Sequence, residues 1–245
     1  MTPLLLLIPG MSNTPRLWDL VRERLTVEVE VRVTDPRANH GIAAMAAAAW
    51  QELADVEASR PLALAGFSMG GHVALQMIAN APRPVQALAL VCSSARPEDP
   101  ADAPMRKRAI ASAQRNWEGY VNAIANHLAT PSTRANTALM DAILSDLRDA
   151  GMASTVAQHH AAASRQDHRA LLPTLRLLAL VMAGGEDPRV PLAAAREVAD
   201  ALPGAHWVEV PGAGHLLPWE QPELVAAEID RWLQEISTPT IETRR

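Results

Sequence analysis

The sequence predicts an α/β fold built on a doubly wound, mostly parallel sheet that carries a helical insertion. Short apolar segments alternate with segments of helical periodicity along most of the chain, as in successive strand–helix–strand units. A block without strand patterns, residues 97–170, separates two of the expected core strands. The length of 245 residues suits one domain with a sizeable core.

The elements of the N-terminal part follow from the spacing of its apolar residues. Residues 4–8 (LLLLI) form a wholly apolar run closed by Pro-Gly, which predicts a buried strand. Apolar residues then recur on one helical face from about Pro15, and valine alternates with a charged residue throughout 27–33 (VEVEVRV). That alternation predicts a strand with one wet face. A loop at 35–41 (DPRANHG) and an alanine-rich helix at 42–58 complete this part.

The remaining elements repeat this alternation on both sides of the strand-free block. A strand at 61–66 runs directly into a helix from Gly70 to about Asn80. The other expected elements are strands at 86–92, within LRLLALVMAGG and at 206–210, and helices at 103–128, 135–150, 191–202 and up to about Ile236.

The same alternation divides the chain into a core and a cap. Residues 1–96 and 171–236 are assigned to the α/β core, and residues 97–170 to a cap of helices. Ligands bind at the carboxyl ends of the strands in open α/β sheets, so we expect the cap to cover that edge. The last residues, 237–245, are expected to form a flexible tail.

Charge and composition exclude several classes of partner. The formal net charge is −5 and no basic patch dominates, so neither nucleic acid nor an anionic membrane is expected as a partner. The N-terminal apolar run stops at Pro9 and is too short for a signal peptide or a membrane span. A cytoplasmic location is therefore expected. The single cysteine, Cys92, excludes an internal disulfide and is interpreted as a small buried hydrophobic residue.

One serine lies at the junction between the strand expected at 61–66 and the helix after it. In the sequence GFSMG, Ser68 has Gly66 two residues before it and Gly70 two residues after it. A sharp strand-to-helix turn exposes one side chain at its tip and leaves no room for side chains nearby, a requirement that the two glycines meet. The pattern predicts Ser68 as a nucleophile; the alternative is an ordinary tight turn.

A serine nucleophile needs a base, and the base needs an acid that orients it. Of the eight histidines, only His215 lies in a glycine-flanked loop directly after a late strand. In enzymes with such a turn the acid lies between nucleophile and base in the sequence, and Asp187 lies in a tight turn after the preceding strand. Asp187 is the preferred acid, although a helix N-cap would look much the same. The other candidate acids are Glu186, Glu98 and Asp99.

Together these features resemble the α/β-hydrolase superfamily, specifically its small bacterial members with a helical cap. The resemblance covers nearly the whole chain. It includes IPGMSNTPRLW (8–18), which is similar to the family's oxyanion loop, and DPRANHG (35–41), which is similar to its Asp-x-Arg-Gly-x-Gly loop. It implies an oxyanion hole made by the backbone N–H groups of Met11 and Met69. Pro9 stands where the family often has histidine.

Family members usually have an antiparallel hairpin before the strand found here at 4–8, and this chain has no room for it. The resemblance therefore implies an α/β-hydrolase fold without that hairpin, in which 27–33 forms the edge of the sheet. Charges on one face of an edge strand discourage sheet-to-sheet association, which fits the alternation in this segment.

The resemblance implies a serine hydrolase that cleaves carboxylic esters or thioesters through an acyl-Ser68 intermediate. Its partner would be a small-molecule ester or acyl substrate, and it would need no metal or organic cofactor. A carbon–carbon hydrolase, an enol-lactonase or a perhydrolase would use the same fold and triad, although carbon–carbon hydrolases often have Asn where this chain has Phe67. A small-ligand receptor or binding module with weak hydrolysis is an alternative of another class.

Several residues of the cap have two interpretations. The basic run at 106–108, together with Arg115, is expected to form an exposed helix face, or else to receive an acidic substrate or carrier. Met105, Trp117 and Tyr120 either line an acyl pocket or pack within the cap.

Histidines outside the candidate triad are interpreted as structural. His159, His160 and His168, even with Asp167 nearby, lack further metal-ligand spacing and are expected to be solvated. His72 is expected to lie on a helix surface or to pack against its neighbours, rather than to act as a second base.

Overall fold

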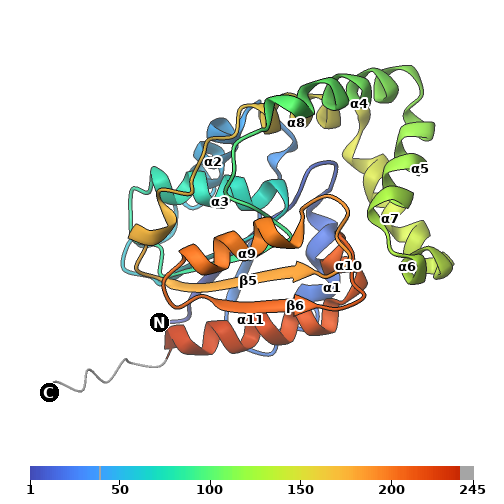
Figure 1. Cartoon of the computed structure of the whole chain (residues 1–245). Coiled ribbons are helices and arrows are strands. Elements are labelled where there is room, and N and C mark those ends of the chain that lie inside the picture. Colours follow the sequence, from blue (N-terminus) through green and yellow to red (C-terminus); the bar gives the residue numbers. More distant parts are fainter. Residues whose placement is uncertain (39, 238–245) are drawn as a thin grey trace, which may run out of the picture.

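The protein is built around one parallel sheet with helices on both faces (Figure 1). The computed structural model describes residues 1–38 and 40–237. Within them, six strands lie in the order β2-β1-β3-β4-β5-β6, and every neighbouring pair is parallel, which confirms the predicted fold class. The strands are β1 (Leu4–Ile8), β2 (Glu30–Val33), β3 (Leu62–Phe67), β4 (Ala87–Val91), β5 (Leu178–Gly184) and β6 (His206–Val210).

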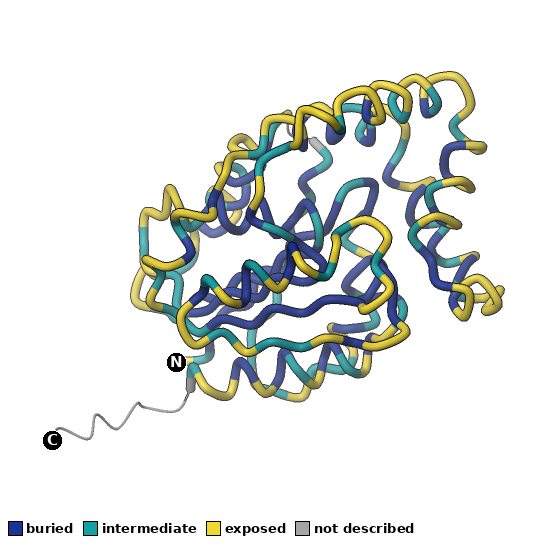
Figure 2. Tube along the Cα trace, in the orientation of Figure 1, coloured by how far each residue is buried: buried dark blue, intermediate teal, exposed yellow. Residues whose placement is uncertain are grey.

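Successive residues of each central strand enter two separate cores. In β1, Leu4, Leu6 and Ile8 pack on the face covered by α2 (Ile42–Gln51), α3 (Met69–Ala79) and α9 (Leu192–Ala201). Leu5 and Leu7 pack on the other face, which is covered by α1 (Asp19–Arg22) and α11 (Pro222–Ser237). Because both faces are dry, β1, β3 and β4 are continuous apolar runs, and they are buried along their whole length (Figure 2).

The insertion between β4 and β5 consists of helices. In Figure 1 these helices stand around the end of the sheet to which β5 points. They are α4 (Ala103–Arg115), α5 (Trp117–Leu128), α6 (Pro131–Ala135), α7 (Thr137–Ala150) and α8 (Met152–Ala163).

The prediction of a single helix at 103–128 is wrong, because the helix is interrupted at Asn116. Asn116 leaves the helical conformation with φ −151° and ψ 88°, and its side chain accepts a hydrogen bond from Gly119 N at 2.9 Å. Asparagine is among the strongest N-cap residues, so α5 starts here as a new helix at an angle to α4. Asn136 starts α7 in the same way, after the short α6.

The edge position predicted for 27–33 is confirmed, but the strand is shorter than expected. β2 contains only 30–33 and, within the described chain, has a neighbour on one side only. Its expected wet face is only half-exposed, because ion pairs cross it. Arg32 pairs with Asp55 at 2.6 Å, and Arg60 pairs with Glu30 at 2.5 Å.

Some expectations concern residues whose structure is not described. Of the tail predicted at 237–245, residues 238–245 lie outside the described residues, as does Asn39 in the loop 35–41. None of the helices in the described ranges has both the length and the apolar character needed to cross a bilayer.

The turn after β3 depends on the close approach of β1 to α3. A Cβ on Gly70 would lie within 2.6 Å of the Pro9 carbonyl oxygen and closer still to that of Ile8. Because both obstacles are backbone atoms, we expect Gly70→Ala to lower the free energy of unfolding by about 3 kcal/mol, the upper end for over-packing. Denaturant unfolding measures this loss.

Gly185→Ala is the matched control, since a Cβ there meets no atom nearer than 3.5 Å. We expect it to change stability by less than about 0.5 kcal/mol. Equal losses in the two variants would show that the close approach at Gly70 is not the cause.

Candidate active site

Ser68 occupies the turn between β3 and α3 in a strained conformation. Its φ of 51° and ψ of −115° place a non-glycine residue in a region that costs on the order of 1–3 kcal/mol. A hydrogen bond from Ser68 N to the Val91 carbonyl, 2.9 Å long, holds the turn against β4. A Cβ on Gly66 would overlap the backbone of Gly70 and Gly71, so the turn cannot close with a larger residue at that position.

Ser68, His215 and Asp187 form a continuous hydrogen-bonded chain. His215 Nε2 lies 2.9 Å from Ser68 Oγ, and His215 Nδ1 lies 2.8 Å from Asp187 Oδ2. The three residues follow β3, β6 and β5, whose carboxyl ends meet at one edge of the sheet. The side chains of His215 and Asp187 are 4% and 1% exposed, so water hardly competes for these bonds.

The loop after β5 sets the direction of the Asp187 carboxylate. Its Oδ1 accepts hydrogen bonds from the backbone N–H groups of Arg189, at 2.7 Å, and Val190, at 2.9 Å, which leaves Oδ2 for His215. A carboxylate only accepts, so His215 carries its proton on Nδ1. Its Nε2 lone pair is then free to accept from the Ser68 hydroxyl.

The other candidate acids do not approach His215. Glu186 is exposed on the same turn. Glu98 is bound by arginines, at 2.5 Å from Arg106 and 2.7 Å from Arg165. Asp99 accepts from the backbone N of Ala101 and so caps its own short helical turn.

The loop that carries His215 is tied to the inserted helices by Glu220. One carboxylate oxygen accepts from Gly214 N at 2.5 Å, and the other accepts from Thr133 Oγ1 at 3.1 Å. Burial raises the pKa of Glu220. Nothing in the local sequence indicated this contact, because Thr133 and Glu220 lie 87 residues apart.

The loop expected to form the oxyanion hole is held by two polar residues of the inserted helices. Asp146 on α7 is fully buried and accepts from Asn13 Nδ2 at 3.1 Å and from Thr14 Oγ1 at 2.5 Å. Gln158 on α8 accepts from Ser12 N at 2.8 Å. Burial raises the pKa of Asp146. The sequence analysis missed both residues, since partners 133 and 146 residues away leave no local pattern.

Met11 and Met69 both border the space in front of Ser68. Within the described chain, the backbone N–H of neither residue donates a hydrogen bond. Backbone donors near the protein interior normally have an acceptor, so these two amides are available to a bound oxygen atom.

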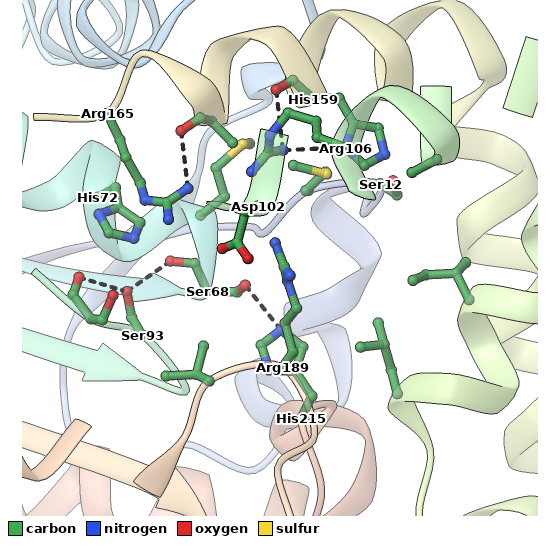
Figure 3. A pocket seen from close by; sticks show the side chains of 18 of the residues that line it. Ser12, Ser68, His72, Ser93, Asp102, Arg106, His159, Arg165, Arg189 and His215 are labelled. Atoms are coloured by element: carbon green, nitrogen blue, oxygen red, sulfur yellow. Dashed lines mark hydrogen bonds between the residues drawn. The ribbon is translucent and has the colours of Figure 1, made fainter. Parts of the chain in front are cut away.

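A cavity of about 480 Å³ opens above Ser68, between the core and the inserted helices (Figure 3). Met105 and Tyr120 line it, which favours the first of their two interpretations. Trp117 instead stacks on Tyr120, with ring centroids 5.6 Å apart and an interplanar angle of 15°. His72, which was interpreted as structural, also borders the cavity, and burial lowers its pKa to about 3.

Two expectations about the insertion between β4 and β5 are wrong. Arg106, predicted on an exposed face, is 8% exposed and lines the cavity, whereas the other members of the basic cluster, Lys107, Arg108 and Arg115, are exposed. His159 and His168, predicted to be solvated, are 8% and 4% exposed. Arg106 and His159 lie on α4 and α8, whereas His168 lies in the loop that follows α8, so tertiary packing rather than local pattern decides each outcome.

The structure offers one arrangement in its described residues that could hold a metal ion. The ligand atoms of Cys92, Asp187 and His215 lie within 4.8 Å of one another. Asp187 and His215 already bond each other, and burial raises the pKa of the Cys92 thiol well above its usual range. The group therefore belongs to the Ser68 site.

Comparison with known proteins agrees with this fold. A relative named pimeloyl-[acyl-carrier protein] methyl ester esterase, from Aromatoleum aromaticum, is 28% identical over 246 residues, covering 93% of this chain and 97% of the relative. A thermophilic esterase from Thermogutta terrifontis, solved with malate bound, superposes with a TM-score of 0.89 at 28% identity, covering 97% of this chain and 92% of that chain. The enol-lactonase of Burkholderia xenovorans shares the fold, with a TM-score of 0.84 at 20% identity, covering 96% of this chain and 92% of that one.

The sequence profile described as the alpha/beta hydrolase family matches residues 5–228, which is most of the chain. With the parallel sheet and the strained serine turn, this match identifies the chain as a member of the alpha/beta hydrolase family.

Proposed function

We propose that this protein is a serine hydrolase that cleaves carboxylic esters or thioesters through an acyl-Ser68 intermediate. The observation that carries the proposal is the hydrogen-bonded chain from Ser68 through His215 to Asp187, at the floor of a cavity large enough for a small ester. The two relatives at 28% identity are both named as esterases, which supports the ester class.

The geometry supports a two-step acyl transfer. His215 Nε2 takes the proton of Ser68 as its Oγ attacks the ester carbonyl, and Asp187 stabilises the imidazolium that forms. The N–H groups of Met11 and Met69 bind the oxyanion, and His215 returns the proton to the leaving alcohol. Water, activated by the same imidazole, then hydrolyses the acyl-Ser68 ester. In this proposal no step requires a metal or an organic cofactor.

In the same proposal residues 97–170 act as a cap over the core formed by 1–96 and 171–236. The cap supplies one wall of the cavity and, through Asp146 and Gln158, holds the loop of Met11. It would therefore select the substrate and support the oxyanion hole at once.

Labelling with a fluorophosphonate tests the assignment of the nucleophile. These reagents phosphonylate activated serines, so we expect a single adduct on the tryptic peptide that contains Ser68, with hydrolysis of p-nitrophenyl esters lost in parallel. A series from acetate to decanoate then measures the acyl preference. Full inactivation with the adduct on another residue would contradict the proposal, and turnover too slow for an enzyme would favour the receptor alternative.

A further inference from the structure

The core side of the cavity presents an arginine that has no partner among the described residues. Arg189 follows Asp187 on the loop after β5 and lines the cavity, and Figure 3 shows its side chain extending from this loop into the space beside Ser68. Across residues 1–38 and 40–237, its guanidinium has no carboxylate or carbonyl partner. A free guanidinium beside a nucleophile is a ready donor for a planar anion.

Behind Arg189, a chain of buried groups fixes the direction of several hydrogen bonds. Arg106 Nη1 lies 3.3 Å from His159 Nδ1, and a guanidinium only donates, so Nδ1 must accept. Burial lowers the pKa of His159 to about 4, with Arg106 contributing, so the ring is neutral at pH 7. Its one proton is therefore on Nε2, which lies 2.8 Å from Tyr120 Oη and donates to it.

The hydroxyl groups at the end of this chain have a proton left over. Tyr120 Oη accepts from His159, and Ser12 Oγ accepts from Thr155 Oγ1 at 3.1 Å. The Tyr120 and Ser12 hydroxyls are neighbours, and each already accepts one hydrogen bond. At most one of the two O–H groups can donate to the other, and both residues line the cavity, so at least one O–H is available to a bound acceptor.

The charges around the cavity also favour an anion. Glu98 is shared by Arg106 and Arg165, so this buried cluster has two guanidiniums for one carboxylate. Two carboxylates also line the cavity: Asp99 accepts from the backbone N of Ala101, and no side chain of the described residues donates to Asp102 or forms an ion pair with it. Near Ser68 the unpartnered donors, Arg189 and one hydroxyl, therefore face Asp102 as the acid without a donor.

We propose that the substrates are esters that carry a carboxylate, which Arg189 and the Tyr120–Ser12 hydroxyl pair bind while Ser68 attacks the ester carbonyl. This inference rests on the proposed function and specifies its substrate class. The carboxylate belongs either to the acyl part, as in a half-ester of a dicarboxylic acid, or to the alcohol part, as in an acylated hydroxy acid.

Paired esters that differ only in charge test the proposal. On the acyl side, monomethyl succinate, glutarate and adipate are each compared with the methyl ester in which the free carboxylate is replaced by a carboxamide. On the alcohol side, the acetate ester of 4-hydroxybutyrate is compared with that of its amide. We expect kcat/KM to favour the anionic member by at least about 10-fold in one of the two series, the range for charge-assisted hydrogen bonds.

Three variants then locate the binding groups. Arg189→Gln is expected to lower kcat/KM for the preferred anion by about 10- to 100-fold and for its amide by less than about 3-fold. Tyr120→Phe should lower kcat/KM for both esters of the pair, because the lost hydroxyl donates equally to a carboxylate or an amide oxygen. Asp102→Asn should increase the preference for the anion, because it removes the opposing charge.

Arg176→Gln is the matched control. Arg176 precedes β5 at the opposite edge of the sheet. In the part of the chain that the structure describes, it bonds only backbone carbonyls of its own turn, so its loss changes the net charge equally without touching the cavity. We expect it to leave the anion-to-amide ratio unchanged.

The outcomes separate the two proposals. If the protein hydrolyses neither the anionic nor the neutral esters, the proposed function itself is contradicted. Hydrolysis of amide and acid forms with equal kcat/KM in both series overturns the carboxylate proposal alone. The carboxylate proposal is also overturned if Arg189→Gln lowers kcat/KM equally for both members of a pair, or if Arg176→Gln causes the same loss.

Discussion

Replacing Ser68 with alanine is expected to lower kcat for p-nitrophenyl acetate by about 10⁴-fold or more, the largest effect we expect of any side chain. The variant lacks the oxygen that forms the acyl intermediate, and His215 has no proton to remove. The residual rate would come from the oxyanion donors and substrate binding alone. The measurement is steady-state hydrolysis with a matched blank, and mass spectrometry of the acylated protein follows the intermediate.

The fold should tolerate this change. Among the described residues the Ser68 hydroxyl bonds only His215, and the backbone contacts of the turn, Ser68 N to the Val91 carbonyl and Ser93 Oγ to the Ser68 carbonyl, remain. Ser154→Ala is the matched control and should keep full activity, because Ser154 lies near the N-terminal end of α8 and bonds the Arg37 carbonyl. Ester turnover by Ser68→Ala near the level of the parent protein would end the proposed mechanism.

Replacing Asp187 with asparagine is expected to lower kcat by about 10³- to 10⁴-fold, with a small change in KM. Asparagine keeps the shape, but its amide group can donate to His215 Nδ1. The ring proton then moves to Nε2, so the atom that faces Ser68 Oγ becomes a donor and cannot act as the base. Steady-state rates across a pH series measure the loss.

Glu186→Gln is the matched control for Asp187→Asn, since it makes the same chemical change one residue earlier. Glu186 is exposed and does not approach His215, so we expect less than about a 3-fold change in kcat, in line with a surface substitution. If Glu186→Gln were as damaging as Asp187→Asn, Asp187 would not be the acid that orients the base.

The features that could be predicted from the sequence are those that depend on the identity of neighbouring residues. The apolar run 4–8 needs only its own composition to indicate a strand buried on both faces. Gly66 and Gly70 predicted the sharp turn because any Cβ there meets backbone atoms, a constraint independent of the rest of the fold. The order of Ser68, Asp187 and His215 predicted their convergence, because the carboxyl ends of parallel strands share one edge.

Only the tertiary structure decided the composition of the cavity wall. The position of Arg106 in a basic run indicated exposure, yet α4 turns that residue inward, where Glu98 neutralises part of its charge. The break at Asn116 changes the direction of the chain and thereby brings Tyr120 to His159. Asp146 holds the loop at Asn13 from the middle of a helix whose sequence is ordinary.

The sequence by itself therefore determined the sheet, the sharp turn at Ser68 and the convergence of Ser68, His215 and Asp187. Backbone geometry and strand burial are local constraints, and each determines the residue types within a short segment of the chain. The tertiary structure alone decided which polar groups face the cavity and which of them lack partners. That outcome depends on how the helices from α4 to α8 rotate and pack, and hydrogen bonds between residues more than a hundred positions apart fix it.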